Sequence, residues 1–261
     1  MHELTPAEQE RMDADGFVVR EGVFGPDEVA AMVEASETLV AGLVEGKDGR
    51  RFTVGSYTFE PAVLDEVMLK WEGDTDALHG IEPVAHLSAE LEAWGLDQRL
   101  TAPMQAFVDD PAPVLFTEKL NLKRAHHGGP NPLHQDFPYW QDNADDARRV
   151  ATAIVYLDDT TLDNGCLEVV PGSHTVGRHP TRTDSDPFGQ LEMDPTANAH
   201  MVRVPLPLPA GSVVCFGAFL AHATGPNRTD RDRRALLYSY QPAGMAHSIE
   251  RLRRLFGTAA S

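Results

Sequence analysis

The second half of the chain is a series of short apolar runs separated by turn residues. From about residue 112, runs rich in Val, Leu, Ile, Tyr and Phe alternate with Gly, Pro, Asn and Asp. Strands are expected at 114–122, 151–157, 167–170, 201–204, 212–216 and 234–241. Short strands at this spacing, without intervening helices, predict a β-sandwich or barrel and argue against βαβ units.

The first 110 residues have a helical pattern instead. Thr5 precedes Pro6, and Glu8 follows three residues after Thr5, so a capping box is expected to start a short helix that ends near Gly16. The remaining expected elements are a strand over 17–20, a helix that begins at 26, and two helices over 86–96 and 98–108. The chain over 41–80 is expected to be irregular. No linker divides the chain, so residues 1–261 are expected to form one domain: a mostly helical scaffold over 1–110 and a β core over 112–245.

Charge and hydropathy exclude several classes of partner. The formal charge of −18 disfavours nucleic acid and anionic membranes. No uncharged apolar stretch reaches the roughly 18 residues that cross a bilayer, and the N-terminal residues lack the pattern of a signal peptide, so a cytoplasmic protein is expected. Cys166 and Cys215 lie in apolar runs, which favours buried reduced thiols.

The residues that carry chemistry begin with His134 and Asp136. On an extended segment their side chains share one face, while Gln135 points away. His222 follows a long apolar run and is expected in the interior, where the alternative is a structural imidazole bonded to a carbonyl. Two histidines and one carboxylate form the facial ligand set of non-heme iron oxygenases. A buried Arg233 would need an anion, such as a small dicarboxylate.

These residues lie in motifs that resemble the phytanoyl-CoA dioxygenase family of Fe(II)- and 2-oxoglutarate-dependent oxygenases. The motifs are the run from Pro132 to Asp136, the runs 163–167 and 170–174, and the run from Gly211 with His222, Thr224 and Arg233. The opening at 15–19 is similar as well. The resemblance covers nearly the whole chain, and it implies a double-stranded β-helix, a cupin-like jelly roll, flanked by N-terminal α-helices.

The resemblance also implies roles for individual residues. His134, Asp136 and His222 would bind Fe(II), and Arg233 with Thr224 would hold the distal carboxylate of 2-oxoglutarate. The strand residues expected to line the cosubstrate and substrate cavity are Thr117, Lys119, Asn121 and Thr152. For Lys119 and Lys123, solvated lysines at a strand end are an equal alternative.

Aromatic residues and a long insertion complete the expected site. Phe137, Tyr139 and Trp140 are candidates for the wall of the substrate pocket, with a place in the core as the alternative. Residues 175–200 are a polar insertion that would serve as a lid or binding loop, or else be disordered. Seven other histidines are expected to be structural: His79, His86, His126, His127, His174, His200 and His247.

The function implied is the oxidation of an unactivated C–H bond in a small organic molecule, in a biosynthetic pathway. Dioxygen and 2-oxoglutarate would be cosubstrates, and no catalytic residue beyond the metal site is expected. Asp136 argues against halogenation, because halogenases of the superfamily carry a small residue there. Two alternatives are a cupin-like metalloprotein that uses its metal as a Lewis acid, for which Arg233 has no role, and a non-catalytic protein that binds a small ligand.

Overall fold

The computed structural model describes residues 2–45, 51–54, 57–62, 66–73, 75–142, 144–182 and 191–250. The helices are α1 (Pro6–Asp15), α2 (Pro26–Glu45), η1 (Ala85–Leu87), α3 (Ala89–Gly95), α4 (Gln98–Val108), α5 (Phe137–Trp140), η2 (Ala147–Arg149) and η3 (Ser173–Val176). The strands of the first half are β1 (Phe17–Arg20), β2 (Phe52–Val54), β3 (Tyr57–Ala62), β4 (Val67–Glu72), β5 (Leu78–Glu82) and β6 (Val114–Lys123). Those of the second half are β7 (Asn131–His134), β8 (Ala151–Tyr156), β9 (Leu167–Val169), β10 (Val204–Leu206), β11 (Val213–Gly217), β12 (His222–Thr224) and β13 (Arg233–Gln241).

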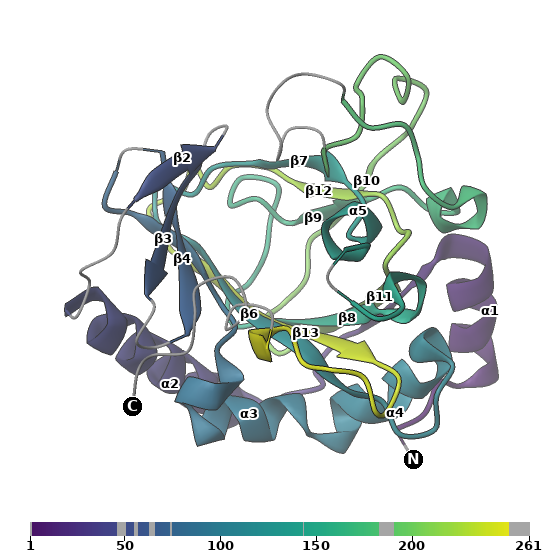
Figure 1. Cartoon of the computed structure of the whole chain (residues 1–261), viewed down its shortest axis with the longest axis horizontal. Coiled ribbons are helices and arrows are strands. Elements are labelled where there is room, and N and C mark those ends of the chain that lie inside the picture. The colour runs from purple at the N-terminus through teal and green to yellow at the C-terminus, as the bar shows by residue number, and fades with distance from the viewer. Residues whose placement is uncertain are drawn as a thin grey trace.

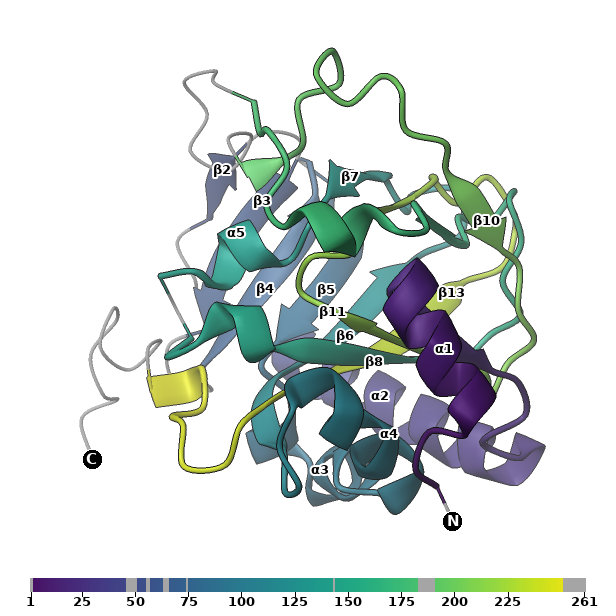
Figure 2. The same ribbon diagram turned by 90° about the vertical axis from the view of Figure 1, so that its right-hand side faces the viewer.

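Two antiparallel sheets face each other. The larger sheet has the strand order β1-β11-β8-β13-β6-β5-β4-β3-β2, and the smaller has the order β10-β9-β12-β7. Figure 1 shows the smaller sheet above β6, β13 and β8, with helices α2, α3 and α4 beneath the larger sheet. The turned view in Figure 2 gives the same arrangement. The expected double-stranded β-helix with flanking N-terminal helices is confirmed.

Each face of the larger sheet has its own apolar core. On the outer face, Met32 of α2, Leu91 of α3 and Met104 of α4 pack with strand residues such as Val155 and Leu236, and all five are buried. Between the sheets, a second cluster joins Ile154, Val214 and Phe216 of the larger sheet to Leu167 and Val169 of the smaller. Alternate residues of β8 and β11 therefore serve opposite faces, as the period of a strand requires.

The start of the chain folds as its sequence predicts. The Thr5 hydroxyl accepts a hydrogen bond from the backbone N–H of Glu8, and the Glu8 carboxylate accepts one from the N–H of Thr5, so the capping box is complete. Gly16 ends α1 in the left-handed conformation, at φ 86°. β1 then joins the edge of the larger sheet by pairing with β11.

The expectation of irregular chain over 41–80 is wrong. Strands β2 to β5 occupy most of 52–82 and extend the larger sheet beyond β6. In β4, Val67, Leu69 and Trp71 are buried and alternate with less buried neighbours, as in a strand covered on one face. Two smaller corrections concern 86–96, which divides into η1 and α3, and the strand expected at 201–204, which runs from Val204 to Leu206.

Cys166 and Cys215 are free and buried, as expected. Among the described residues, no helix combines the length and apolar character needed to span a membrane.

Candidate metal centre

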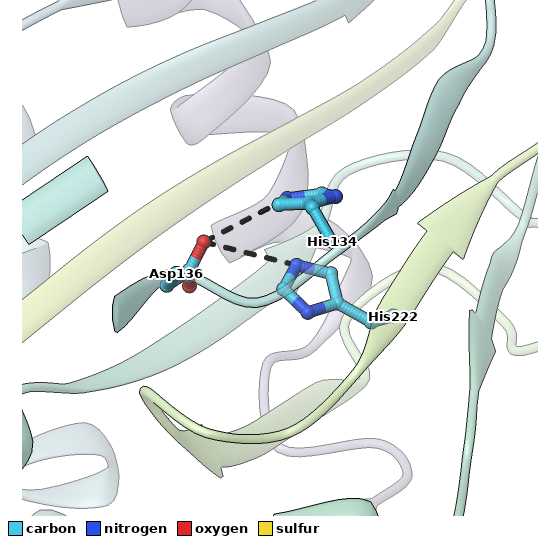
Figure 3. A group of neighbouring side chains, drawn as sticks. All are labelled: His134, Asp136 and His222. Carbon is cyan, nitrogen blue, oxygen red and sulfur yellow. Dashed lines mark ion pairs between the residues drawn. The ribbon is translucent and has the colours of Figure 1, made fainter. Parts of the chain in front are cut away.

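Two adjacent strands of the smaller sheet place the two histidines. His134 ends β7 and His222 begins β12, and the two residues are direct partners in the antiparallel register. Side chains of such partners project from the same face. Asp136 follows β7 by two residues, at the N-cap position of the short helix α5, which turns its carboxylate back towards the histidines. Figure 3 shows the three side chains converging.

The three side chains lie at distances that suit one metal ion. Nε2 of His134 is 3.7 Å from Oδ1 of Asp136, and Nε2 of His222 is 3.9 Å from the same oxygen. One ligand atom of each residue lies within 4.8 Å of those of the other two. Among the described residues, this is the one group of three or more His, Cys, Asp or Glu side chains with such geometry.

Backbone carbonyls fix the tautomer of both imidazoles. Nδ1 of His134 is 2.7 Å from the carbonyl of Pro132, and Nδ1 of His222 is 3.0 Å from the carbonyl of Leu220. Because a carbonyl can only accept, each Nδ1 must carry the proton and donate. Each Nε2 therefore presents a lone pair towards Asp136, the arrangement that metal-binding histidines use.

Electrostatics favour a neutral imidazole at His134. Burial, together with the neighbouring His222, holds the pKa of His134 well below its usual value. Burial raises the pKa of Asp136. A divalent cation would place a strong positive charge beside this partly buried carboxylate and favour its charged form. The donor set of two imidazole nitrogens and one carboxylate fits Fe(II) and leaves one face of an octahedral ion open.

Arg233 reaches the site from the larger sheet. It begins β13, which pairs with β6 and β8, whereas His222 begins β12 of the smaller sheet. The side chain is 4% exposed, and its Nη2 donates to the carbonyl of Gly165 at 2.9 Å. Its Nε is buried and has no acceptor among the residues that the structure describes. This buried, unsatisfied donor fits an anionic ligand.

A cavity of about 520 Å³ joins Arg233 to the metal centre. Its wall includes the three candidate metal ligands and most of the expected site residues: Lys119, Asn121, Tyr139, Trp140, Thr224 and Arg233. Lys119 is partly exposed and forms an ion pair with Glu82 at 3.0 Å, so its ammonium has a partner in the cavity wall. Tyr139 lies edge-on to the His134 ring, with centroids 5.6 Å apart.

Three expected cavity residues lie elsewhere. Neither Thr117 nor Thr152 lines the cavity: Thr117 donates to the carboxylate of the wall residue Glu82, and Thr152 shares a hydrogen bond with Ser239. Phe137 stacks on Phe219 with ring centroids 4.6 Å apart, so the core alternative holds for this aromatic. Both threonines share the cavity-facing side of their strands, but they lie farther along them.

The cavity wall also contains ionisable and polar residues to which the sequence assigned no site role. Lys70, His79, Lys123, Tyr156 and Glu192 all line it. His79 is buried against Glu72, so it combines its expected structural role with a place in the wall. Lys123 is 2% exposed, and the solvated-lysine alternative is wrong for it. Lys119, Asn121 and Lys123 are alternate residues of one strand, so the sequence pattern already places Lys123 on the same face as the two expected wall residues.

Gln135 secures the insertion at 175–200. Its side chain points away from the metal ligands and donates to the carbonyls of Gly177 and Phe219, while its Oε1 accepts from the N–H of His179. Farther along, Glu192 forms a β-bridge with His134, which brings Leu191 and Glu192 into the cavity wall. The described part of the insertion thus contributes to the site, and residues 183–190 lie outside the described residues.

Comparisons with known proteins agree with this geometry. The chain is 28% identical to phytanoyl-CoA dioxygenase domain-containing protein 1 of Mus musculus over 267 residues, which cover 89% of this chain and 88% of that protein. It is 34% identical to L-proline trans-4-hydroxylase of Streptomyces griseoviridis over 185 residues, or 63% of this chain and 66% of that enzyme. The fold is similar to that of the non-heme alpha ketoglutarate dependent carbocyclase from nogalamycin biosynthesis, with a TM-score of 0.73, 20% identity and coverage of 94% and 86%.

A double-stranded β-helix with this ligand set defines the class of non-heme iron dioxygenases that use 2-oxoglutarate. Within that class, the chain belongs to the phytanoyl-CoA dioxygenase family, whose model matches residues 12–235.

Proposed function

We propose that the protein hydroxylates, or otherwise oxidises, an unactivated C–H bond of a small organic molecule in a biosynthetic pathway. The observation that carries the proposal is one cavity that holds both a facial metal-ligand set and a buried arginine with an unsatisfied donor. A metal used only as a Lewis acid gives that arginine no role. In the proposed roles, His134, Asp136 and His222 hold Fe(II), and Arg233 with Thr224 holds the distal carboxylate of 2-oxoglutarate.

The protein's own contribution is orientation and exclusion of water. The carbonyls of Pro132 and Leu220 hold the imidazoles with Nε2 towards the ion. Bound Fe(II), with 2-oxoglutarate, supplies the activation of dioxygen. Apolar residues of the larger sheet, such as Ile154, Ala235 and Leu237, line the cavity and would pack against the methylene groups of the cosubstrate.

The substrate proposal rests on the size and the wall of the cavity. A volume of about 520 Å³ lies within the range of small-molecule sites and leaves space beside a five-carbon cosubstrate. Tyr139 and Trp140 provide an aromatic wall close to His134. Relatives named for proline and ectoine also act on small molecules. We therefore place a small metabolite at this wall.

The test is turnover of 2-oxoglutarate to succinate by the protein loaded anaerobically with Fe(II) and then exposed to oxygen. We expect succinate from the wild type, and a loss of about 100-fold or more in kcat/KM for 2-oxoglutarate in Arg233→Ala, because a buried charge-assisted pair is removed. Arg231→Ala is the matched control, since this exposed arginine lies two residues earlier and outside the cavity wall.

Each outcome separates the candidate functions. No succinate from the loaded wild type would refute the proposal and favour a Lewis-acid or ligand-binding protein. Equal turnover in Arg233→Ala and Arg231→Ala would refute only the role of Arg233. A mass-spectrometric screen of candidate metabolites for a product heavier by one oxygen atom would then identify the substrate.

A further inference from the structure

Lys123 is a buried lysine in the wall of the active cavity. It ends β6, and its side chain is 2% exposed. Its stem packs against two glycines: a Cβ on Gly128 would lie 2.6 Å from Lys123 Cβ, and a Cβ on Gly165 would lie 3.1 Å from Lys123 Cδ. Its amine donates to the carbonyl of Gly129. Because close packing holds the stem, the amine has a defined position in the free protein.

Lys123 and Arg233 form a pair of cavity-facing residues. They are direct cross-strand partners in the register of β6 and β13, so their side chains leave the larger sheet on the same face. Both line the cavity. They also share Gly165, whose carbonyl accepts from Arg233 and whose Cα lies against the Lys123 stem. The positive charge of Arg233 acts on the Lys123 amine, so the two cationic groups lie close enough to interact.

The charges around Lys123 leave its amine short of a counter-ion. The neighbouring groups are Arg233 on β13, Lys70 and Glu72 on β4, and His79 on β5. Glu72 is the one anion among them, and it also accepts hydrogen bonds from His79 and from the N–H of Gly129. Burial, followed by the repulsion of Arg233, lowers the pKa of Lys123 to about 6. Near neutral pH the free protein thus has a largely uncharged amine here.

We propose that Lys123 is a second cationic ligand of the distal carboxylate of 2-oxoglutarate, and that its amine takes up one proton from solvent when the cosubstrate binds. An ammonium has three N–H donors, of which one serves Gly129 and the others can reach a carboxylate. The incoming negative charge stabilises the protonated form, so binding and protonation are coupled. This inference rests on the proposed function of the cavity as a 2-oxoglutarate site.

The test is isothermal titration calorimetry of the Fe(II)-loaded protein, without oxygen, in buffers of different ionisation enthalpy at pH 7.5. Two ligands are compared: 2-oxoglutarate, and 2-oxopentanoate, which has the same chain length and metal-binding end but a methyl group in place of the distal carboxylate. We expect 2-oxoglutarate to take up about one proton more than 2-oxopentanoate, because the incoming carboxylate should raise the pKa of the amine from about 6 to above the pH of the experiment. The comparison cancels protons that the metal centre exchanges with either ligand.

Two variants assign the proton to Lys123. Lys123→Met should abolish the additional proton uptake and reduce the preference for 2-oxoglutarate over 2-oxopentanoate about tenfold or more, which is the usual worth of a charge-assisted hydrogen bond. Lys123→Arg, which keeps a permanent charge, should retain more of that preference without taking up a proton. Thermal melts and Fe(II) affinity check that both variants fold.

The outcomes distinguish this inference from the function on which it rests. If neither ligand binds the loaded wild type, both fail. If 2-oxoglutarate binds with no additional proton and Lys123→Met keeps the full preference, then the amine only anchors the loop at Gly129 and the proposal for Lys123 is wrong, while the proposed function stands. If Lys123→Met does not fold, Lys123→Arg decides the question: proton uptake by this variant equal to that of the wild type would assign the proton to another group, such as the nearby Lys70, and would overturn the proposal.

Discussion

At the scale of single residues, Asp136 is the candidate metal ligand that carries a negative charge. Its Oδ1 lies within 4 Å of Nε2 of both histidines, and it is the acidic member of the candidate metal-ligand set. We expect Asp136→Asn to weaken Fe(II) binding about 100-fold or more and to abolish succinate formation, because the amide keeps the shape but not the charge. Competition with a coloured Fe(II) chelator under anaerobic conditions measures the affinity. Asp163→Asn, at an exposed turn, is the control, and equal affinity in both variants would exclude Asp136 as a ligand.

The site was predictable to the extent that its residues are fixed by short-range patterns. His134 and Asp136 are two apart on an extended segment, and an apolar run leads to His222, so the sequence selects the three side chains that the structure brings together. The structure places Thr117 and Thr152 outside the cavity wall in which they are expected, because alternation fixes the face of a strand and not the depth along it. Lys70 and His79 were missed because their strands, β4 and β5, were themselves not expected.

At the scale of elements, the strands over 52–82 mark the limit of prediction from local pattern. Glycines, a proline and charged residues interrupt the apolar residues of this stretch, and its clearest strand signal is the alternation of Val67, Leu69 and Trp71. What stabilises these strands is pairing, because β5 joins β6 and β4 joins β5. Pairing between strands that are distant in the sequence cannot be predicted from neighbouring residues. The capping box can, because Thr5 and Glu8 are only three residues apart.

The docking of α1 onto β1 provides a prediction that depends on pH. Arg20 of β1 donates to both carboxylate oxygens of Glu8, at 2.7 and 2.9 Å. Through this contact, Arg20 lowers the pKa of Glu8 from 4.5 to about 2. A carboxylate with a lowered pKa stabilises the fold above its ordinary pKa, and this stabilisation is lost as the pH falls from about 4.5 towards 2.

We therefore expect Glu8→Gln to melt about 2–4 °C below the wild type at pH 7, since a partly exposed pair contributes on the order of 1 kcal/mol. The difference should shrink as the pH is lowered below about 4.5. Differential scanning fluorimetry from pH 7 to pH 3.5 follows it. Glu10→Gln, on the exposed side of the same helix, should melt with the wild type throughout, and a difference independent of pH would point to altered packing instead of the ion pair.

At the scale of the whole molecule, the candidate site joins the two sheets. The smaller sheet supplies His134 and His222, and the larger sheet supplies Arg233 and Lys123 across the cavity. A metal ion with 2-oxoglutarate would bridge them through one network of polar contacts. A ligand that binds only the assembled sandwich stabilises it by mass action.

We therefore expect Fe(II) and 2-oxoglutarate together, under anaerobic conditions, to raise the melting temperature more than Fe(II) alone. At a cosubstrate concentration about 100 times its Kd, the stabilisation is about 2.7 kcal/mol, or about 5–10 °C for a domain of this size. A chelator should remove the whole increase, because the keto acid end of the cosubstrate needs the metal. In His134→Ala the increase should be absent, and in Arg233→Ala the metal should still stabilise while 2-oxoglutarate adds nothing. If 2-oxoglutarate raised the melting temperature of Arg233→Ala as much as that of the wild type, the cosubstrate would not link the two sheets through this arginine.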